Sequence, residues 1–245
     1  MRARGIIFDW GNTLVDVELD WELIRGLRRE SMAEHLRAVW GLADPWPLVE
    51  EFLRLRSLHR GLALREQYER PAPAGLREAL ANLALAEPRR GLVEEALAAF
   101  FAPEVERIHP FPDAVETLRE LRRRGILLAL VSNNTWAPCI RATLRPGALA
   151  GLLDPDVHSS EVRFRKPDPA MLLLVLRRWG LGPAEVVVVG DKRDRDVLAA
   201  RRLGMRSVWA RMRPEHEVTE EAEACLPDAE IRTLAELLDL VRPDP

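Results

Sequence analysis

The chain has 245 residues, of which 47% are apolar and 31% are charged, as in an ordinary soluble globular protein. Its net charge of -3 argues against nucleic acid as a partner, and the sequence shows neither a signal peptide nor an apolar run long enough to span a membrane. Cys139 and Cys225 lie far apart without a metal-binding spacing, so we expect free thiols and a cytoplasmic location.

The first predicted strand ends in an acidic residue. The apolar run Ile6 to Phe8 is typical of a strand buried on both faces, and it stops at Asp9. Gly11, Asn12 and Thr13 follow, and they suit a tight turn or a left-handed backbone. Open α/β sheets bind ligands beyond the carboxyl ends of their strands. Asp9 is therefore a candidate functional residue, although an acid that merely caps a loop gives the same local pattern.

The segment from Asp16 to Ile108 has the apolar spacing of helices and no strand pattern. Asp20 suits the start of the first helix, and Gly41 suits its end. The predicted helices span Asp20 to Trp40, Leu48 to Leu64, Ala74 to Leu85 and Arg89 to Phe101.

Strands and helices alternate after this segment. Strands are predicted over Ile126 to Val131, Val157 to Ser160, Glu185 to Val189 and Arg206 to Ala210, with a short one from Ile231. Helices are predicted over Ala114 to Arg124, Trp136 to Leu144, Arg165 to Trp179, Asp194 to Leu203 and Leu234 to Val241, and Arg213 to Glu223 reads as an acidic loop. This order predicts an α/β fold, a Rossmann-like parallel sheet with helices on both faces. We expect the core to comprise residues 1–15 and 109–245, and an all-helical domain to comprise residues 16–108.

Polar residues end or follow four of these segments, and in a parallel sheet such loops share one edge. They are Asp9, Ser132 with Asn133, Lys166, and Asp191 with Asp194 and Asp196. Each alone has a structural explanation, because Ser132 can cap a helix and most lysines are solvated. However, Lys166 and Lys192 are the only lysines among 36 cationic residues, so a lysine at this edge is informative.

The chemistry available to such a set is phosphoryl transfer. Asp9 and Asp191 can supply oxygen ligands to Mg²⁺, and Asp9 can attack phosphorus to form an aspartyl-phosphate. Lys166 can neutralise phosphate charge and hold the nucleophile, while Ser132 and neighbouring backbone N–H groups can donate to the phosphate oxygens. Catalysis would come mainly from positioning and electrostatics.

Taken in order, these motifs resemble those of the haloacid dehalogenase superfamily of hydrolases. The first family motif corresponds to Phe8–Leu14, the second to Val131–Asn133, the third to Lys166–Pro169, and the fourth to Gly190-Asp191 followed by Asp196. The resemblance covers Gly5 to Val15 and His109 to about Ala210, and the four motifs together are highly specific. The helical segment is similar to the cap that this family inserts after its first motif to select substrates.

The resemblance implies a Mg²⁺-dependent phosphatase acting on a small phosphate ester. It assigns catalysis to Asp9, Ser132 and Lys166, and phosphate binding to Ser132, Asn133 and Lys166. It assigns the metal to Asp9, the backbone carbonyl of Gly11, Asp191 and Asp196, with Asp194 as an alternative to Asp196.

The chain departs from the family pattern at Gly11, where the phosphatases usually carry an acid/base Asp. Loss of a general acid costs about 10²–10⁴-fold in rate. Some family phosphatases resemble this chain in having Gly-Asn here, and water or a cap residue can then protonate the leaving group. Asp16 is a possible substitute, but we favour a hinge role for it.

Three other functions remain open. Dehalogenases of the family also lack the second Asp, but they use no metal, which gives Asp191 and Asp196 no purpose. The phosphonoacetaldehyde hydrolase branch resembles Asp9-Trp10-Gly11, but it needs a cap lysine for a Schiff base, and no lysine lies between Asp16 and Ile108. A regulatory module with a vestigial site is the third.

The cap residues that contact the substrate cannot be chosen from the sequence. The candidates are Trp21, Arg25, Arg54, Arg56, His59, Arg60 and Tyr68, most of which are expected to be solvated or packing residues. An arginine-rich cap suggests an anionic substrate.

Overall fold

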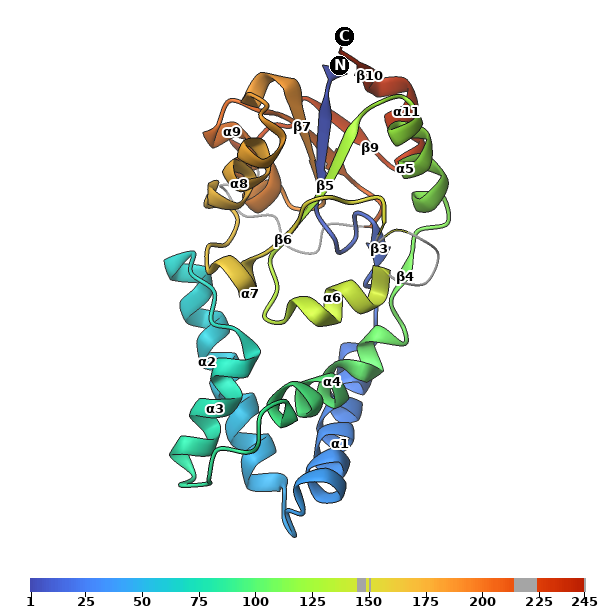
Figure 1. The fold of residues 1–245 in the computed structure, drawn as a ribbon. Coiled ribbons are helices and arrows are strands. Elements are labelled where there is room, and N and C mark those ends of the chain that lie inside the picture. The colour runs from blue at the N-terminus through green and yellow to red at the C-terminus, as the bar shows by residue number, and fades with distance from the viewer. Residues whose placement is uncertain (145–148, 150, 214–223, 245) are drawn as a thin grey trace.

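The computed structural model describes residues 1–144, 149, 151–213 and 224–244, so residues 214–223 of the predicted acidic loop lie outside the described part. A sheet of parallel strands fills one half of the molecule (Figure 1). From edge to edge its strands are β6 (Asp156–His158), β5 (Leu127–Ser132), β2 (Gly5–Phe8), β7 (Val186–Gly190), β8 (Arg206–Ala210) and β9 (Ala229–Ile231). Strand β2, the first of these six along the chain, thus lies in the middle of the sheet, while β1 (Arg2–Ala3) pairs with β10 (Arg242–Pro243) apart from it.

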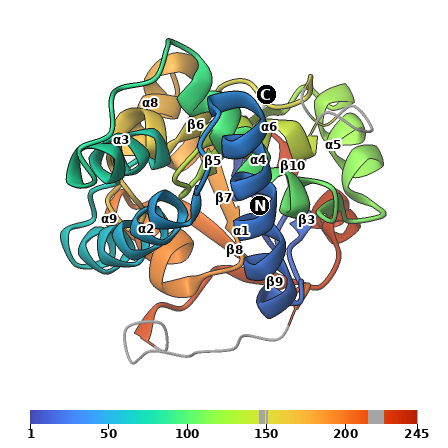
Figure 2. The same cartoon turned by 90° about the horizontal axis from the view of Figure 1, so that it is seen from below.

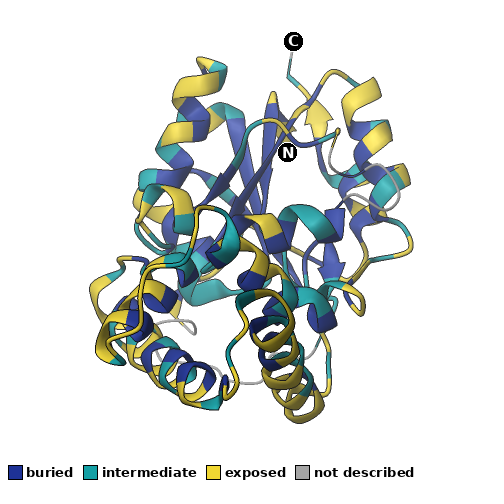
Figure 3. Ribbon diagram, turned by 60° about the horizontal axis from the view of Figure 1, so that its bottom comes forward, coloured by how far each residue is buried: buried dark blue, intermediate teal, exposed yellow. Residues whose placement is uncertain are grey.

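Successive residues of the central strand face opposite layers of helices. Ile6 and Phe8 pack with α5 (Ala114–Arg123), α6 (Ala137–Leu144) and α11 (Leu237–Leu240), whereas Ile7 packs with α8 (Ala170–Trp179) and α9 (Leu198–Arg202). Figure 3 shows the strands buried between helices whose outer faces are exposed. The predicted Rossmann-like α/β fold is therefore confirmed.

The segment between β3 (Val15–Asp16) and β4 (His109–Pro110) forms helices α1 (Trp21–Trp40), α2 (Trp46–Glu66), α3 (Ala72–Asn82) and α4 (Leu92–Val105). They surround an apolar core of their own, in which Phe52 and Phe100 meet edge to face with ring centroids 5.3 Å apart. Figure 2, which shows the molecule from below, has these helices in front of the sheet. Among the described residues, no helix is both long and apolar enough to cross a lipid bilayer.

Local sequence signals set several helix ends. The Asp20 carboxylate accepts hydrogen bonds from the backbone N–H groups of Glu22 and Leu23, which starts α1 as predicted. Gly41 ends it with a left-handed backbone (φ 70°). Helix α4 begins at Leu92 rather than Arg89, because Gly91 adopts φ 94° and cannot continue a helical turn.

Two predicted segments near the sheet edge differ in the structure. The strand predicted over Val157 to Ser160 stops at His158, and residues from Ser159 form the short helix α7 (Ser159–Val162). The helix predicted from Arg165 begins only at Ala170, because Pro167 and Pro169 offer no backbone N–H for helical bonds. The intervening loop carries Lys166.

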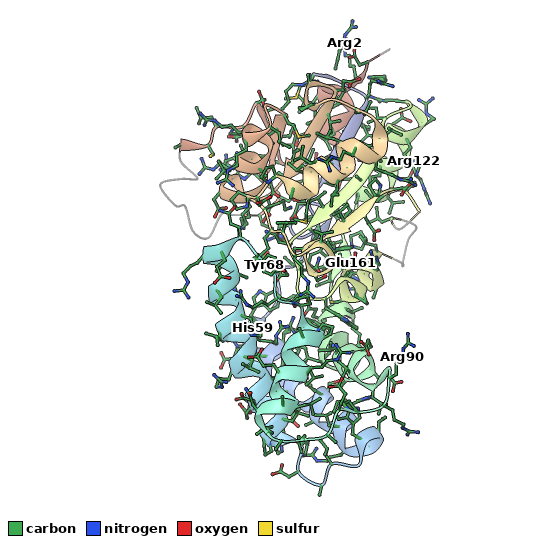
Figure 4. All side chains as sticks on the ribbon, turned by 60° about the vertical axis from the view of Figure 1, so that its left-hand side comes forward. Arg2, His59, Tyr68, Arg90, Arg122 and Glu161 are labelled. Carbon is green, nitrogen blue, oxygen red and sulfur yellow. The ribbon has the colours of Figure 1, made fainter. Side chains whose placement is uncertain are left out.

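The helical half is held to the α/β half by two kinds of contact. Strands β3 and β4 pair antiparallel where the chain leaves and re-enters the core. The turn between α2 and α3 also touches the core: the N–H of Ala72 donates to Thr135 O (2.8 Å), and the N–H of Arg165 donates to Gln67 O (3.1 Å). In Figure 4, Tyr68 marks this junction.

Candidate active site

Three neighbouring strands end in the predicted polar residues. Strand β2 lies between β5 and β7, with Phe8 aligned to Leu130 and Val189, so Asp9 emerges beside the ends of both neighbours. Ser132 is the last residue of β5, and Asp191 follows the last residue of β7. The carboxyl edge of the sheet thus brings together side chains that are far apart in the sequence.

The loop after Asp9 is a tight turn. The N–H groups of Leu14 and Val15 both donate to the carbonyl of Trp10, and Asn12 has a left-handed backbone (φ 53°), which asparagine tolerates. The Asn12 side chain accepts from the N–H of Val17 (3.3 Å). Gly11 lines the pocket above Asp9 together with Asn12.

The Gly190-Asp191 motif is explained by the position of Asp196. A π-helical turn, Arg193–Val197, brings the Asp196 carboxylate back over the strand end, where it accepts from the N–H of Lys192 (3.1 Å). A Cβ atom on residue 190 would lie 2.2 Å from Cγ of Asp196, so glycine is required there. Asp194 instead lies 3.9 Å from Arg195, outside the acidic cluster.

Lys166 lies at the centre of the acidic side chains. Its buried Nζ donates to Asp9 Oδ1 (2.6 Å) and to the carbonyl of Val131 (2.8 Å), and it lies 2.6 Å from Asp196 Oδ1. Asn133 fixes the backbone of Lys166 from both sides, donating to its carbonyl and accepting from its N–H at 2.9 Å each. The side-chain amide of Asn133 is thereby occupied in holding Lys166.

The donor atoms at this edge fit a small divalent cation. One carboxylate oxygen from each of Asp9, Asp191 and Asp196 lies within 4.8 Å of the other two. Ligands of octahedral Mg²⁺ lie about 3–4 Å apart, and Mg²⁺ prefers such hard oxygen donors. Lys166 lies between Asp9 and Asp196, and Lys192 lies 3.6 Å from Asp191. The two lysines carry one charge fewer than the three carboxylates, so a cation at this position would also relieve their repulsion.

Burial and mutual repulsion shift the ionisation of these groups. Burial, followed by the charges of Asp9 and Asp196, raises the pKa of Asp191 to about 7. Burial also raises the pKa of Asp9, although the charge of Lys166 opposes it. Burial works to lower the pKa of Lys166, but the carboxylates of Asp196 and Asp9 outweigh it and raise that pKa. The ammonium group is therefore retained at neutral pH.

Two adjoining pockets lie over the sheet edge. The first, of about 200 Å³, is lined by Asp9, Ser132, Lys166 and Asp191 among others. The second, of about 280 Å³, lies between the α/β core and the turn that joins α2 to α3. Asn133 and Arg195 line both pockets, so a molecule bound at Asp9 can extend from the first into the second.

Only some of the residues of the helical segment that were predicted as substrate-contact candidates lie near the site. Arg56, His59 and Arg60 line the second pocket, whereas Arg54 is exposed and forms an ion pair with Glu51 (2.7 Å). Trp21 and Tyr68 are partly exposed and line neither pocket. Arg25 lines another cavity, inside the helical domain, which Arg56 and Arg60 also border.

Sequence reasoning missed Glu69, Arg165 and Arg195, which also line the second pocket. Buried Glu69 forms an ion pair with Arg165 and accepts from the hydroxyl of Ser159 (2.8 Å). Nothing in the spacing of Glu69 distinguishes it from the many solvated acids of the helical segment. Arg195 lies between Asp194 and Asp196 in the sequence, and the prediction considered only the two acidic residues there.

Asp16 forms an ion pair with Arg213 and accepts from the N–H of Glu18 (3.0 Å). Burial opposes the shift, but the hydrogen bond and charge of Arg213 lower the pKa of Asp16 below its usual value. Asp16 pairs through β3 with His109 of β4, where the helical domain joins the core. A carboxyl with a lowered pKa is a poor proton donor, so these contacts support the hinge interpretation.

The sequence-family model of the haloacid dehalogenase-like hydrolases matches residues 3–204 of this chain. The chain therefore belongs to this family of hydrolases. A glyceraldehyde 3-phosphate phosphatase of Methanopyrus kandleri is 32% identical over 157 residues, which cover 64% of this chain and 67% of that protein. A phosphoserine phosphatase of Thermus thermophilus is 38% identical over 122 residues, covering 49% of this chain and 48% of its own length.

Among solved structures, a 2-haloacid dehalogenase from Pseudomonas syringae has a TM-score of 0.71 at 23% identity, with 97% of both chains covered. At this identity the likeness shows the shared fold. The family match over residues 3–204 shows that the chain is a hydrolase.

Proposed function

We propose that the protein is a Mg²⁺-dependent phosphatase that hydrolyses a small phosphate monoester through an aspartyl-phosphate on Asp9. The observation that carries this proposal is the cluster of Asp9, Asp191 and Asp196 around Lys166. Two phosphatases among the relatives support the same reaction.

Each residue of the first pocket has a task in this mechanism. A carboxylate oxygen of Asp9 attacks phosphorus while the bond to the ester oxygen breaks, and water then cleaves the acyl phosphate to release inorganic phosphate. Lys166 fixes Oδ1 of Asp9 and offsets phosphate charge. The Ser132 hydroxyl and the N–H of Asn133 donate to the phosphate oxygens.

The metal has a defined place in the proposal. Asp9, Asp191, Asp196 and the carbonyl of Gly11 would hold Mg²⁺, with Asp196 preferred over Asp194 because it belongs to the carboxylate cluster. Bound Mg²⁺ supplies the positive charge that lets a phosphate dianion approach these carboxylates.

The leaving group must be protonated without an Asp at position 11. Gly11 has no side chain, and Asp16 is held by Arg213 with a lowered pKa. We assign this proton to water, so esters with poor leaving groups should react slowly, by about 10²–10⁴-fold relative to an enzyme with a general acid.

A 2-haloacid dehalogenase is the alternative that the absence of a second acid favours, because Asp9 could equally attack a carbon that bears halogen. Against it stand the three clustered carboxylates, which a metal-independent reaction does not need. A regulatory protein with a vestigial site is a further alternative, and the intact Lys166 network speaks against it.

A single set of assays separates these functions. We expect p-nitrophenyl phosphate, whose leaving group needs no protonation, to be hydrolysed with Mg²⁺ and not after chelation, and Asp9→Asn to be inactive. Chloroacetate hydrolysis that resists a chelator would establish the dehalogenase. Absence of any turnover, identical in wild type and Asp9→Asn, would establish the vestigial site.

The proposal also retains the wider predictions. Residues 1–15 and 109–245 would form the catalytic core, and residues 16–108 a cap that selects the substrate. The partner would be a small phosphate ester in the cytoplasm, with no role for nucleic acid or membranes.

A further inference from the structure

The second pocket is strongly cationic for its size. Its lining among the described residues includes the arginines at positions 56, 60, 70, 165 and 195 and one carboxylate, Glu69. Several of these charges are already balanced: Arg165 pairs with Glu69, and Arg70 pairs with Glu66 at 2.8 Å. In Figure 4, His59 marks the α2 side of this pocket, where it pairs with Glu78 (3.0 Å).

Arg56 is the exception among the inner arginines. Its guanidinium lies 5.1 Å from the ring centroids of both Phe100 and Phe101 and donates to the hydroxyl of Thr135 (3.1 Å). In the described part of the chain, no carboxylate forms an ion pair with Arg56. The rings attract the guanidinium but carry no net charge, and Glu69 acts on it without forming an ion pair. The half-buried positive charge of Arg56 is therefore not fully balanced, and an anion bound beside it would be attracted.

The neighbouring Arg28 packs against the same aromatic rings, but its positive charge is balanced by a carboxylate. Its guanidinium lies 5.4 Å from the centroids of the same two rings, but it forms an ion pair with buried Glu104. The two guanidinium groups repel each other, and Glu104 balances one positive charge. The other remains on Arg56, which lines the second pocket and also borders the cavity inside the helical domain.

We propose that the substrate carries a second acidic group, a carboxylate or a further phosphate, and that Arg56 binds it while the reacting phosphate lies at Asp9. Arg60, one helical turn further along α2, lines the same pocket and adds to the attraction. This inference rests on the proposed phosphatase function and specifies its substrate class. The shared lining by Asn133 and Arg195 lets one small molecule reach both groups.

The test compares esters that differ only in the second group. Glycerol 3-phosphate and 3-phosphoglycerate share a carbon chain and its C2 hydroxyl, and glycerol 1,3-bisphosphate keeps both while supplying a second phosphate instead of a carboxylate. We expect wild-type kcat/KM to be about tenfold or more higher for at least one acidic ester than for glycerol 3-phosphate. The ester with the greater value identifies which acidic group is bound.

Arg56→Gln should remove this preference. A charge-assisted bond is lost, so kcat/KM for the preferred ester should fall roughly ten- to hundredfold, mainly through KM. The fall should be at least about tenfold smaller for p-nitrophenyl phosphate, which lacks the second group. Arg56→Lys should restore part of the preference, because it keeps the charge but not the planar fork.

Two control variants separate charge from structure. Arg54→Gln removes an exposed arginine from the same helix and should leave every substrate unaffected. Thr135→Val removes the hydrogen bond to Arg56 but not its charge, and should retain the preference.

Three outcomes would overturn the inference. Wild-type enzyme that hydrolyses p-nitrophenyl phosphate but shows no preference for either acidic ester would refute it while leaving the phosphatase proposal intact. An equal fall for all substrates in Arg56→Gln would mean that Arg56 only positions the cap. Failure to hydrolyse any phosphate ester would overturn both proposals.

Discussion

Lys166 holds the carboxylate cluster together in the absence of a metal. Its Nζ bridges Asp9 and Asp196 at 2.6 Å each, in a site where both partners are substantially buried. Removal of one member of a buried ionic group leaves the other charges uncompensated, which is more damaging than loss of a surface pair.

Lys166→Met should therefore destabilise the metal-free protein by about 3–5 kcal/mol and abolish turnover. Because Mg²⁺ then becomes the main counter-charge, its stabilising effect should be larger in the variant than in wild type. Thermal unfolding with EDTA and with Mg²⁺ measures both effects. An unchanged melting temperature in EDTA would show that Lys166 does not carry the charge balance.

The pKa of Asp191 predicts how pH controls metal binding. In the folded chain this pKa is about 7, above the ordinary value of 3.8. Between these values the folded state binds the extra proton, so the stability of the metal-free protein falls as pH rises from about 4 to 7. Mg²⁺ must displace that proton below pH 7 and meets no such competition above it.

We therefore expect the Mg²⁺-induced rise in melting temperature to be larger at pH 8 than at pH 6, and the apparent affinity to weaken by up to about tenfold per pH unit below 7. Asp191→Asn should show no such dependence from this group. An equal Mg²⁺ effect at pH 6 and pH 8 in wild type would contradict the assignment.

At the scale of elements, the π-helical turn after β7 decides which acid joins the cluster. It returns Asp196 to the strand end and leaves Asp194 beside Arg195. Gly190 makes this possible, because the Asp196 carboxylate fills the space of a Cβ atom.

Gly190→Ala should displace Asp196, lower the stability by about 1–3 kcal/mol through overpacking and weaken Mg²⁺ binding. Gly61→Ala is a matched control on α2, where an added Cβ meets nothing within 4 Å and should stabilise the helix by about 0.5–1 kcal/mol. Calorimetric unfolding compares the two. Gly190→Ala with wild-type stability and metal binding would refute the role of this contact.

The strand-end residues could be anticipated from the sequence because their positions follow from topology. Asp9, Ser132 and Asp191 each stand at the end of an apolar strand, and parallel strands bring their carboxyl ends to one edge. The choice of Asp196 over Asp194 could not be predicted from the sequence, because both residues suit the first turn of a helix and a π turn has no simple sequence signal. The metal and catalytic roles of these residues stay predictions.

The contacts between the two halves of the molecule could not be predicted from the sequence either. Helical periodicity places a residue on a face of its own helix, but it does not state which face meets the core. Glu69 lies in a turn between helices, so no period applies to it. Its partners Ser159 and Arg165 are distant from it in the sequence. Only the folded structure shows that these residues meet Glu69.

At the scale of the whole molecule, Glu69 is a buried polar link between the helical segment and the α/β core. Its buried carboxylate binds Arg165 and Ser159, and its N–H donates to Arg163 O (2.5 Å). Glu69→Ala should lower the stability by about 3–5 kcal/mol because Arg165 loses its counter-charge. Urea unfolding measures this, with Glu116→Ala, which removes an exposed ion pair with Arg119 on α5, expected to change little. Equal effects in the two variants would contradict a specific tie at Glu69.

The most direct test of the whole account is calorimetric titration of Mg²⁺ into wild type and Asp191→Asn at pH 8. If Asp9 and Asp191 share one cation, wild type binds a single Mg²⁺ and the variant binds it at least about tenfold more weakly. Equal binding by both proteins, or none by wild type, would contradict the proposed metal centre and the phosphatase mechanism built on it.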